Sequence, residues 1–398
     1  MKLLIACPMA ESARQALKSL VNEIEYAPDS NAESILANID SVGILVVNQQ
    51  RVGREILGAA KTLQMVIRAG EGVGEISVDM ASEQGILVSH CPGVYDQSTA
   101  ELAFGLMIAL DRRLVDHTIE LRENRWARGT ISEYRGLAGK CLGILGYEPE
   151  GQRIAEIANA IGMDVHVWSP TAVDSANEGE ITIASHPVAL AESCDFVCLT
   201  PMPESDQTPV VGREFLNALP AHAIFVNVGS AHEVAEKELR QTIETKKLLV
   251  GVDTHLSTPS GNEAKFRSEL FKAGQVIGTP KLSHWTSQAR DAVADEVVRV
   301  IRAFLINGEP RNCVNLLEKS PATWQLVLRV RDQVGVMASI LDAIRADGVN
   351  AEEITSRVFT GAKAAWCTIA LDERPSRDAV ATIRQLPDIM HLELRAVI

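Results

Sequence analysis

The sequence lacks any apolar run that approaches the roughly 20 residues of a membrane-spanning helix, and it has no low-complexity tract. Residues 1–6 are too short for a secretory signal peptide and fit a first β-strand instead. Positive charge is also scarce, because the 398 residues carry a formal net charge of -14 at pH 7. We therefore expect neither a nucleic acid nor a membrane as a partner.

Cysteine is sparse and scattered. The seven thiols are odd in number and spread along the chain, which indicates reduced, mostly buried thiols in a cytoplasmic protein rather than a disulfide framework. Cys194 and Cys198 lie four residues apart, but no second pair of ligands is near them in the sequence, so we expect no metal site. With 46% hydrophobic and 23% charged residues, the composition is that of a globular protein, long enough for two or three domains.

One stretch, residues 142–155, predicts the centre of the fold. Its first four residues are apolar and bounded by glycine, which indicates a buried strand. A tight turn follows, and Pro149 suits the first turn of a helix, where its missing N–H costs nothing. Residues 164–168 predict the next strand. The stretch is therefore a βαβ unit, the core of a dinucleotide-binding fold.

The turn departs from the G-x-G-x-x-G pattern where backbone should approach a pyrophosphate. Its three positions hold Gly146, Glu148 and Gly151, and Glu150 adds a second carboxylate. Two unit charges about 5 Å apart at an effective dielectric near 20 repel by roughly 3 kcal/mol, on the order of a hundredfold in affinity. Alternatively, a carboxylate here occupies the helix N-terminus itself. Ser169 stands where an acid should meet the ribose. We expect NAD or NADP to bind, but weakly.

The rest of the chain predicts three structural regions. Residues 1–100 alternate short apolar strands with helices, which indicates a small parallel α/β domain. An apolar helix at 100–110 leads into the second region, residues 101–283. This region contains the βαβ unit and further strands at 196–199, 224–227, 248–252 and 276–277. Residues 322–398 follow the order βαββαβ, the ferredoxin-like arrangement. The predicted fold class is α/β, with two Rossmann-like or flavodoxin-like parallel-sheet domains and a C-terminal ferredoxin-like domain.

Five segments resemble D-2-hydroxyacid dehydrogenases, and among them D-3-phosphoglycerate dehydrogenases with a C-terminal ACT domain: residues 67–73, 91–93, 98–102, 137–146 and 332–336. The resemblance covers nearly the whole chain. It implies an active site in the cleft between the first two domains, with the substrate-type domain at 1–100 completed by residues 284–318 and the ACT domain at 322–398. It also implies NAD as cofactor, with Thr99 among the cofactor-binding positions.

The family's catalytic residues, carried over one at a time, are replaced. Ser230 stands where the family has the arginine that holds the substrate carboxylate, Thr258 replaces the glutamate that orients the catalytic histidine, and Lys281 replaces that histidine. Hydride transfer to a 2-oxo acid needs a proton donor at the carbonyl oxygen and a cation for the carboxylate. Lys281 can donate a proton and His284 can swing in. The alternative is that Lys281 is a solvated surface charge and His284 a packing residue.

Ligand-facing features remain in the first domain. Gly70, Gly72 and Val73 belong to a glycine-rich loop whose N–H groups can hold a carboxylate or phosphate, and Arg68 precedes it. A plain tight turn is the alternative.

In the ACT domain, the resemblance implies effector positions at Val330, Asp332 and Asn350, of which only Asn350 matches the family. Asp332 favours a ligand with a free amine.

Two functions stay open. The first is a catalytically silent relative that binds a small acid, an amino acid or a protein partner, because the replacements touch different steps of the standard mechanism. The second is an active NAD(P)-dependent 2-hydroxyacid oxidoreductase with a site rebuilt around Lys281, His284 and Ser230. In either case the apolar helix at 100–110 predicts a homodimer, with ACT pairing giving a tetramer. The sequence names neither the ligand nor the choice between NAD and NADP.

Overall fold

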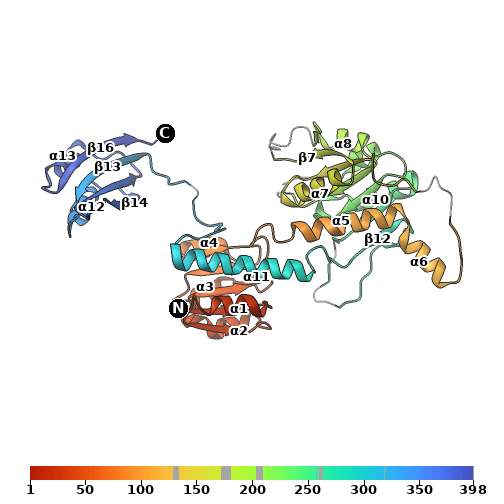
Figure 1. The fold of residues 1–398 in the computed structure, drawn as a ribbon, viewed down its shortest axis with the longest axis horizontal. Helices are drawn as coiled ribbons and strands as arrows, with labels where there is room; N and C mark the ends of the chain where they lie inside the picture. The colour runs from red at the N-terminus through yellow and green to blue at the C-terminus, as the bar shows by residue number, and fades with distance from the viewer. Residues whose placement is uncertain are drawn as a thin grey trace. The chain divides into compact units, whose positions relative to one another are not determined.

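The computed structural model describes residues 1–128, 134–171, 181–202, 209–256, 258–259, 263–317 and 319–397. The chain divides into two compact units, Met1–Asn315 and Leu316–Ile398. The first unit contains two parallel sheets and the second contains one antiparallel sheet, so the predicted α/β fold class is confirmed (Figure 1).

Five parallel strands form the first sheet, in the order β2-β1-β3-β4-β5. The strands are Lys2–Ile5 (β1), Glu23–Tyr26 (β2), Ile44–Val47 (β3), Met65–Arg68 (β4) and Leu87–Ser89 (β5). The intervening helices are Glu11–Leu17 (α1), Ala32–Asn38 (α2), Arg54–Ala59 (α3) and Val78–Glu83 (α4). Strand β3 is apolar and buried along its whole length because apolar clusters cover both faces of the sheet.

A helix from a distant part of the chain also packs on this sheet. Val297, Val300 and Ile301 of α11 (Ser287–Arg302) share a cluster with Leu3 and Ile5 of β1. A π-helical turn, Ala303–Asn307, continues α11. Residues 287–307 therefore form one continuous helix with a wider final turn.

Seven parallel strands form the second sheet, in the order β12-β11-β10-β9-β6-β7-β8. The strands are Cys141–Leu145 (β6), Asp164–Trp168 (β7), Thr182–Ile183 (β8), Phe196–Leu199 (β9), Ile224–Asn227 (β10), Leu249–Val252 (β11) and Val276–Gly278 (β12). Its helices are Pro149–Ala160 (α7), Pro187–Ser193 (α8), Arg213–Ala218 (α9) and Glu236–Lys246 (α10). Parallel strands place their carboxyl ends at one edge, where ligands of such folds bind.

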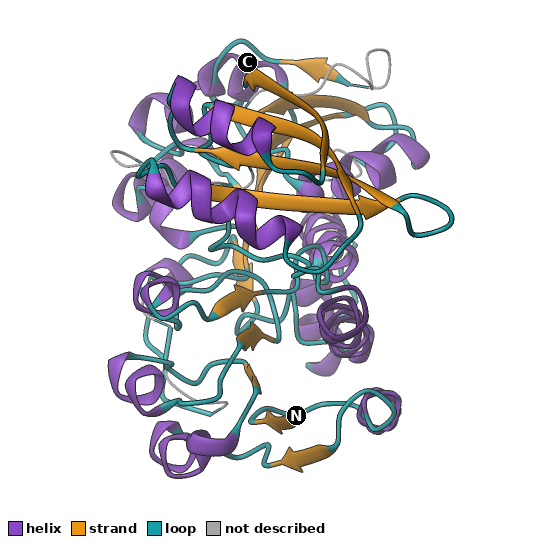
Figure 2. Cartoon of the chain, turned by 90° about the vertical axis from the view of Figure 1, so that its left-hand side faces the viewer, coloured by secondary structure: helices purple, strands orange, loops and turns teal. Residues whose placement is uncertain are grey.

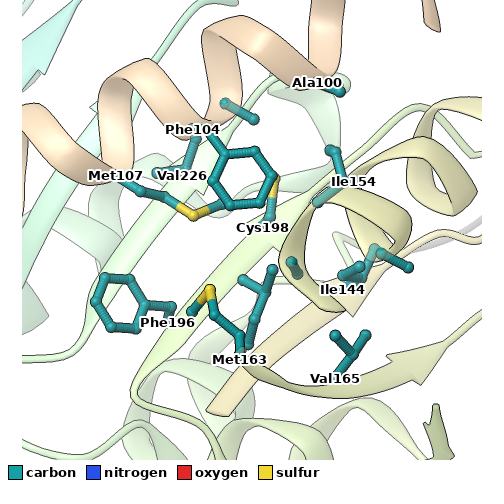
Figure 3. Close-up of a cluster of buried hydrophobic side chains, with 14 of the residues drawn as sticks. Ala100, Phe104, Met107, Ile144, Ile154, Met163, Val165, Phe196, Cys198 and Val226 are labelled. Carbon is teal, nitrogen blue, oxygen red and sulfur yellow. The ribbon is translucent and has the colours of Figure 1, made fainter. Parts of the chain in front are cut away.

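The long helix α5 (Asp96–Asp111) packs on the second sheet. Phe104 and Met107 lie over Phe196 and Cys198 of β9 and contribute to the main apolar cluster of this region (Figure 3). Ile108 of α5 stays 43% exposed. The next helix, α6 (Leu114–Arg122), has no buried residue. The sheet thus buries one stripe of α5, and apolar side chains on both helices remain uncovered in the single chain.

The second unit has the order βαββαβ. Its strands are Trp324–Arg331 (β13), Ala351–Val358 (β14), Ala364–Leu371 (β15) and Ile389–Ala396 (β16), and its helices are Val336–Ala346 (α12) and Arg377–Gln385 (α13). The antiparallel sheet has the order β14-β15-β13-β16. Ile340 and Ile344 of α12 and Ile383 of α13 form one apolar cluster with the sheet. The two helices lie side by side over the strands of this sheet (Figure 2). This is the predicted ferredoxin-like arrangement.

Two strands of the parallel sheets were not predicted from the sequence. Strand β2 carries two glutamates and lies at a sheet edge, and β8 has only two residues, both exposed. Strands β7, β9 and β10 have the bounds that their apolar patterns predicted. No helix among the described residues is long and apolar enough to cross a membrane.

Candidate functional site

The turn after β6 needs glycine at its first and third motif positions. Gly146 has φ +97°, and a Cβ there would lie 2.5 Å from Thr200 Oγ1 and 3.0 Å from the Pro201 carbonyl oxygen. A Cβ on Gly151 would lie 2.3 Å from the carbonyl oxygen of Gly146. Thr200 Oγ1 lies 3.0 Å from the carbonyl oxygens of Leu145 and Gly146 and donates to them. These two glycines are therefore required by packing, whether or not a cofactor binds.

The middle position, Glu148, turns its carboxylate away from the helix. Glu148 is the N-cap of α7, but its side chain makes no capping hydrogen bond. Its Oε1 instead accepts a hydrogen bond from Thr171 Oγ1 at 3.2 Å, and Thr171 Oγ1 lies 2.8 Å from Ser169 Oγ. The structure thus brings Glu148 and Ser169 together at the carboxyl end of β7. The Glu148 carboxylate therefore lies near the position where this fold usually has its ribose-binding acid. Glu148, however, belongs to the turn after β6 and not to the end of β7.

Glu150 belongs to a cluster of acids that the sequence did not reveal. Carboxylate oxygens of Glu71, Asp96 and Glu150 all lie within 4.8 Å of one another. Burial, reinforced by Glu150, raises the pKa of the Glu71 carboxyl to about 8, and burial also raises the pKa of Glu150. Glu71 and Glu150 are hydrogen-bonded to each other. At neutral pH the pair holds a proton, so Glu150 contributes less than a full charge to the turn.

The residues at the family's catalytic positions are Ser230, Thr258 and Lys281, and the hydroxyl groups of Ser230 and Thr258 are hydrogen-bonded to backbone two or three residues away. Ser230 is exposed, and its Oγ accepts from the His232 N–H at 3.2 Å. Thr258 is exposed, and its hydroxyl donates to the His255 carbonyl at 3.0 Å. Lys281 is exposed and has φ +62°. Among the described residues, no hydrogen bond or ion pair joins any two of these side chains or His284.

A buried carboxylate holds the turn that carries Lys281 and His284. Asp253 is fully buried and accepts hydrogen bonds from Thr279 Oγ1 at 2.5 Å and from the Leu282 and Ser283 N–H groups at 2.6 and 2.9 Å. The carboxylate is therefore committed to the backbone of this turn. These hydrogen bonds fix the backbone directly before His284.

His284 lies against the first domain rather than in solvent. Its ring centroid is 5.3 Å from that of Tyr95. Burial, followed by the charges of Lys281 and Arg68, lowers the pKa of His284, although Asp253 opposes the shift. No carboxylate within the described residues hydrogen-bonds to this imidazole. His284 is consequently neutral at pH 7.

Some hydrogen-bond donors in and beside the glycine-rich loop after β4 are already bonded to other protein groups. Arg68 Nη1 donates to the Glu71 carbonyl at 2.6 Å, and the Gly72 N–H donates to His90 Nδ1 at 3.3 Å. Gly70 has φ +148°, and a Cβ there would lie 2.2 Å from Arg68 Nη1 and 2.6 Å from the Tyr95 hydroxyl. The glycine therefore allows the arginine and the tyrosine to approach each other. Val73 packs on the core of the first sheet.

Three other predicted positions lie apart from this group. Thr99 is buried within α5. Asp332 is exposed, and its N–H donates to the Lys363 carbonyl at 3.2 Å. Asn350 is exposed, and its side chain donates to Glu352 at 2.6 Å. No hydrogen bond joins Asp332 to Asn350 among the described residues.

The chain resembles known dehydrogenases and reductases over most of its length. The profile of the NAD binding domain of D-isomer specific 2-hydroxyacid dehydrogenases matches residues 104–283. A hydroxypyruvate reductase from Thermotoga maritima is 30% identical over 72% of this chain and 94% of its own length. A D-3-phosphoglycerate dehydrogenase from Methanocaldococcus jannaschii is also 30% identical, over 79% of this chain. The chain spans only 59% of that relative's length.

Solved structures give the same fold at lower identity. An NAD⁺-bound 3-phosphoglycerate dehydrogenase from Entamoeba histolytica superposes with a TM-score of 0.62 over 80% of this chain and 99% of its own, at 22% identity. An acyclic imino acid reductase in complex with NADPH and D-Arg gives a TM-score of 0.67 over 79% of this chain and 100% of its own, at 20% identity.

Proposed function

The chain belongs to the family of D-isomer specific 2-hydroxyacid dehydrogenases, and on this premise we propose that it is a nucleotide-binding homologue without the family's standard hydride transfer. It is similar to D-3-phosphoglycerate dehydrogenases, and we propose that it serves as a ligand-binding or regulatory relative of them. The C-terminal ferredoxin-like unit is proposed to be an ACT domain.

One observation carries the proposal: the pKa of the His284 imidazole is lowered, and no carboxylate among the described residues hydrogen-bonds to it. Reduction of a 2-oxo acid needs a proton donor at the carbonyl oxygen. His284 has a lowered pKa, and the nearby Asp253 is committed to the backbone of its own turn. Ser230 supplies a neutral hydroxyl where a cation would hold the substrate carboxylate. A substrate bound here would therefore lack both the proton and the bidentate clamp.

We propose that the cofactor, NAD or NADP, binds weakly. The Glu148 carboxylate lies beside the turn that would receive the pyrophosphate, and its charge opposes the phosphates. Because Glu71 and Glu150 share a proton, Glu150 adds little to this repulsion, which comes from about one charge, that of Glu148. The Gly146 and Gly151 positions still form the close turn that the fold uses for a dinucleotide.

We further propose a small acid or amino acid as ligand and a homodimer or homotetramer as the assembly. Leu114, Val115 and Ile119 of α6 are 49%, 45% and 47% exposed, an apolar surface suited to a second copy. In the second unit, Ile354 and Val358 on the edge strand β14 are 45% and 54% exposed, which suits strand pairing between copies. The compartment is proposed to be the cytoplasm.

A second candidate function rests on the position of His284. Its ring contacts Tyr95, and both groups feel the charge of Arg68, so an imidazole and a cation occur together in the cleft. A neutral imidazole is a competent general base, as oxidation of a 2-hydroxy acid requires. An active oxidoreductase with a rebuilt site would use His284 in this role, with Lys281 or Arg68 holding the carboxylate.

Two measurements on the full chain test the proposal. Calorimetric titrations with NAD, NADH, NADP and NADPH measure cofactor affinity. Assays with 3-phosphoglycerate, hydroxypyruvate and glyoxylate, followed by absorbance of the reduced nicotinamide, measure turnover. We expect nucleotide binding without turnover. Turnover that His284→Ala abolishes and Lys247→Ala leaves unchanged would establish the second function, since exposed Lys247 directly follows α10 and is none of the site residues described above.

A further inference from the structure

A second group of side chains meets away from the cleft. Cys141, His166 and Cys194 each offer one ligand atom, and these atoms all lie within 4.8 Å of one another. Cys141 begins β6, His166 lies in β7 opposite Gly143, and Cys194 directly follows α8. The cofactor turn follows Leu145 at the opposite end of β6. The cluster is therefore separate from the proposed nucleotide site.

The two thiols are in direct contact. Cys141 Sγ lies 2.8 Å from Cys194 Sγ. Cys194 is fully buried, and Cys141 is partly exposed, so the pair can be reached from one side. A Cβ on Gly143 would lie 3.1 Å from Cys194 Sγ, so the glycine leaves the room that this sulfur occupies. Hydrophobic packing alone does not explain why these two thiols lie next to a histidine.

The histidine is oriented from both sides. Its Nε2 lies 3.5 Å from the Asp164 carboxylate. Its Nδ1 lies 3.2 Å from Ser193 Oγ, which is itself 3.6 Å from Cys194 Sγ. Nδ1 therefore lies next to Ser193, whose hydroxyl is close to Cys194 Sγ, and Nε2 faces a carboxylate. Metal-bound histidines are commonly held this way, because a carboxylate at the outer nitrogen fixes the tautomer.

We propose that Cys141, Cys194 and His166 bind a zinc ion. Two thiolates and one imidazole form a donor set that Zn²⁺ prefers, and the partly exposed side leaves a fourth position for water. With Zn–S bonds of about 2.3 Å and tetrahedral angles, the two sulfurs lie about 3.8 Å apart. They must separate by about 1 Å from their present 2.8 Å, which side-chain rotation can provide.

Zinc accounts for the cluster better than a disulfide does. A disulfide needs only the two sulfurs, at about 2.05 Å, and gives no role to His166 or Asp164. Zinc binding uses all three donors and the outer carboxylate. It replaces two S–H bonds by two S–Zn bonds and releases two protons, so the affinity should rise with pH.

Titration of the reduced full-length protein with Co²⁺ and Zn²⁺ tests the proposal. One equivalent of Co²⁺ is expected to give the near-ultraviolet charge-transfer band of thiolate ligation, and Zn²⁺ should displace it. Cys141→Ser and Cys194→Ser should abolish the band, and His166→Ala should weaken Zn²⁺ binding at least tenfold. Asp164→Asn should weaken it about tenfold to a hundredfold. Cys313→Ser is the matched control, because this partly exposed thiol bonds only to Asn315 among the described residues.

Three results would overturn the assignment. The first is the absence of a Co²⁺ band in the unmodified protein whose far-ultraviolet circular dichroism shows it to be folded. The second is metal binding that survives both cysteine substitutions. The third is reduced protein that takes up no Zn²⁺ but forms a Cys141–Cys194 disulfide when hydrogen peroxide is added, which would make the pair a redox element instead.

Discussion

The hydrogen-bonded pair of Glu71 and Glu150 should make the first unit less stable as pH rises. The pKa of Glu71 is raised from 4.5 to about 8, so between these values the folded chain holds a proton that the unfolded chain has lost. Stability falls with pH wherever the folded state binds more protons. Because a tenfold change in an equilibrium constant corresponds to about 1.4 kcal/mol, raising this pKa from 4.5 to about 8 costs at most on the order of 5 kcal/mol of stability at high pH. Solvent reaches part of Glu71 and Glu150 shares the proton, so we expect about 2 to 3 kcal/mol.

Replacing Glu71 by glutamine should remove this loss. A glutamine keeps a donor for Glu150 and carries no charge at any pH. Glu71→Gln should therefore have nearly the unmodified free energy of unfolding at pH 5 and exceed it by about 2 to 3 kcal/mol at pH 8.5. Urea unfolding followed by tryptophan fluorescence at both pH values measures the difference. Exposed Glu55 on α3 provides the control, because Glu55→Gln removes the same charge without the buried contact. An equal effect of Glu71→Gln at the two pH values would show that the pair does not share a proton.

Three further predictions concern the cofactor, the chemistry and the assembly. Glu148→Gly should strengthen NAD binding about tenfold in a calorimetric titration, because it removes one charge from the phosphate turn; unchanged affinity would rule out the electrostatic argument. Oxidation of 3-phosphoglycerate should require Ser230→Arg, Thr258→Glu and Lys281→His together, since groups that act as a unit are not additive; full activity in any single variant would contradict this. Light scattering should give a dimer or tetramer for the full chain and a smaller assembly after truncation near residue 317; a monomer at micromolar concentration would refute the dimer.

The sequence predicted the parts of the fold that local patterns determine. Strands β9 and β10 are continuous apolar runs because helices cover both sides of a parallel sheet, and such runs are visible without tertiary information. Strand β2 was missed because an edge strand with Glu23 and Glu25 has no such run. The family and the ferredoxin-like order of the second unit were also predicted correctly.

The sequence did not predict how distant side chains meet. Glu71 lies on the loop after β4, Asp96 begins α5 and Glu150 lies in the first turn of α7, and only the tertiary fold brings their carboxylates together. Cysteine spacing drew attention to Cys194 and Cys198, which lie in different apolar clusters, whereas Cys194 actually meets Cys141 from a strand far away in the chain. Periodicity and spacing describe contacts within one element, so convergent sites of this kind lie beyond them.

The glycines of the cofactor turn have two different physical origins, and this explains how the chain can keep the fold while its cofactor site changes. Gly146 and Gly151 face protein atoms so closely that a Cβ at either would come within about 2.5 Å of them, so the fold itself requires glycine there. Glu148 sits between them with φ -65° and ψ 174°, an extended conformation that any residue adopts, so only a bound pyrophosphate would require glycine at that position. Substitution at the middle position therefore costs the fold nothing and alters the charge that a dinucleotide meets. A protein with this turn can retain the complete βαβ unit while its affinity for the cofactor is adjusted by one side chain.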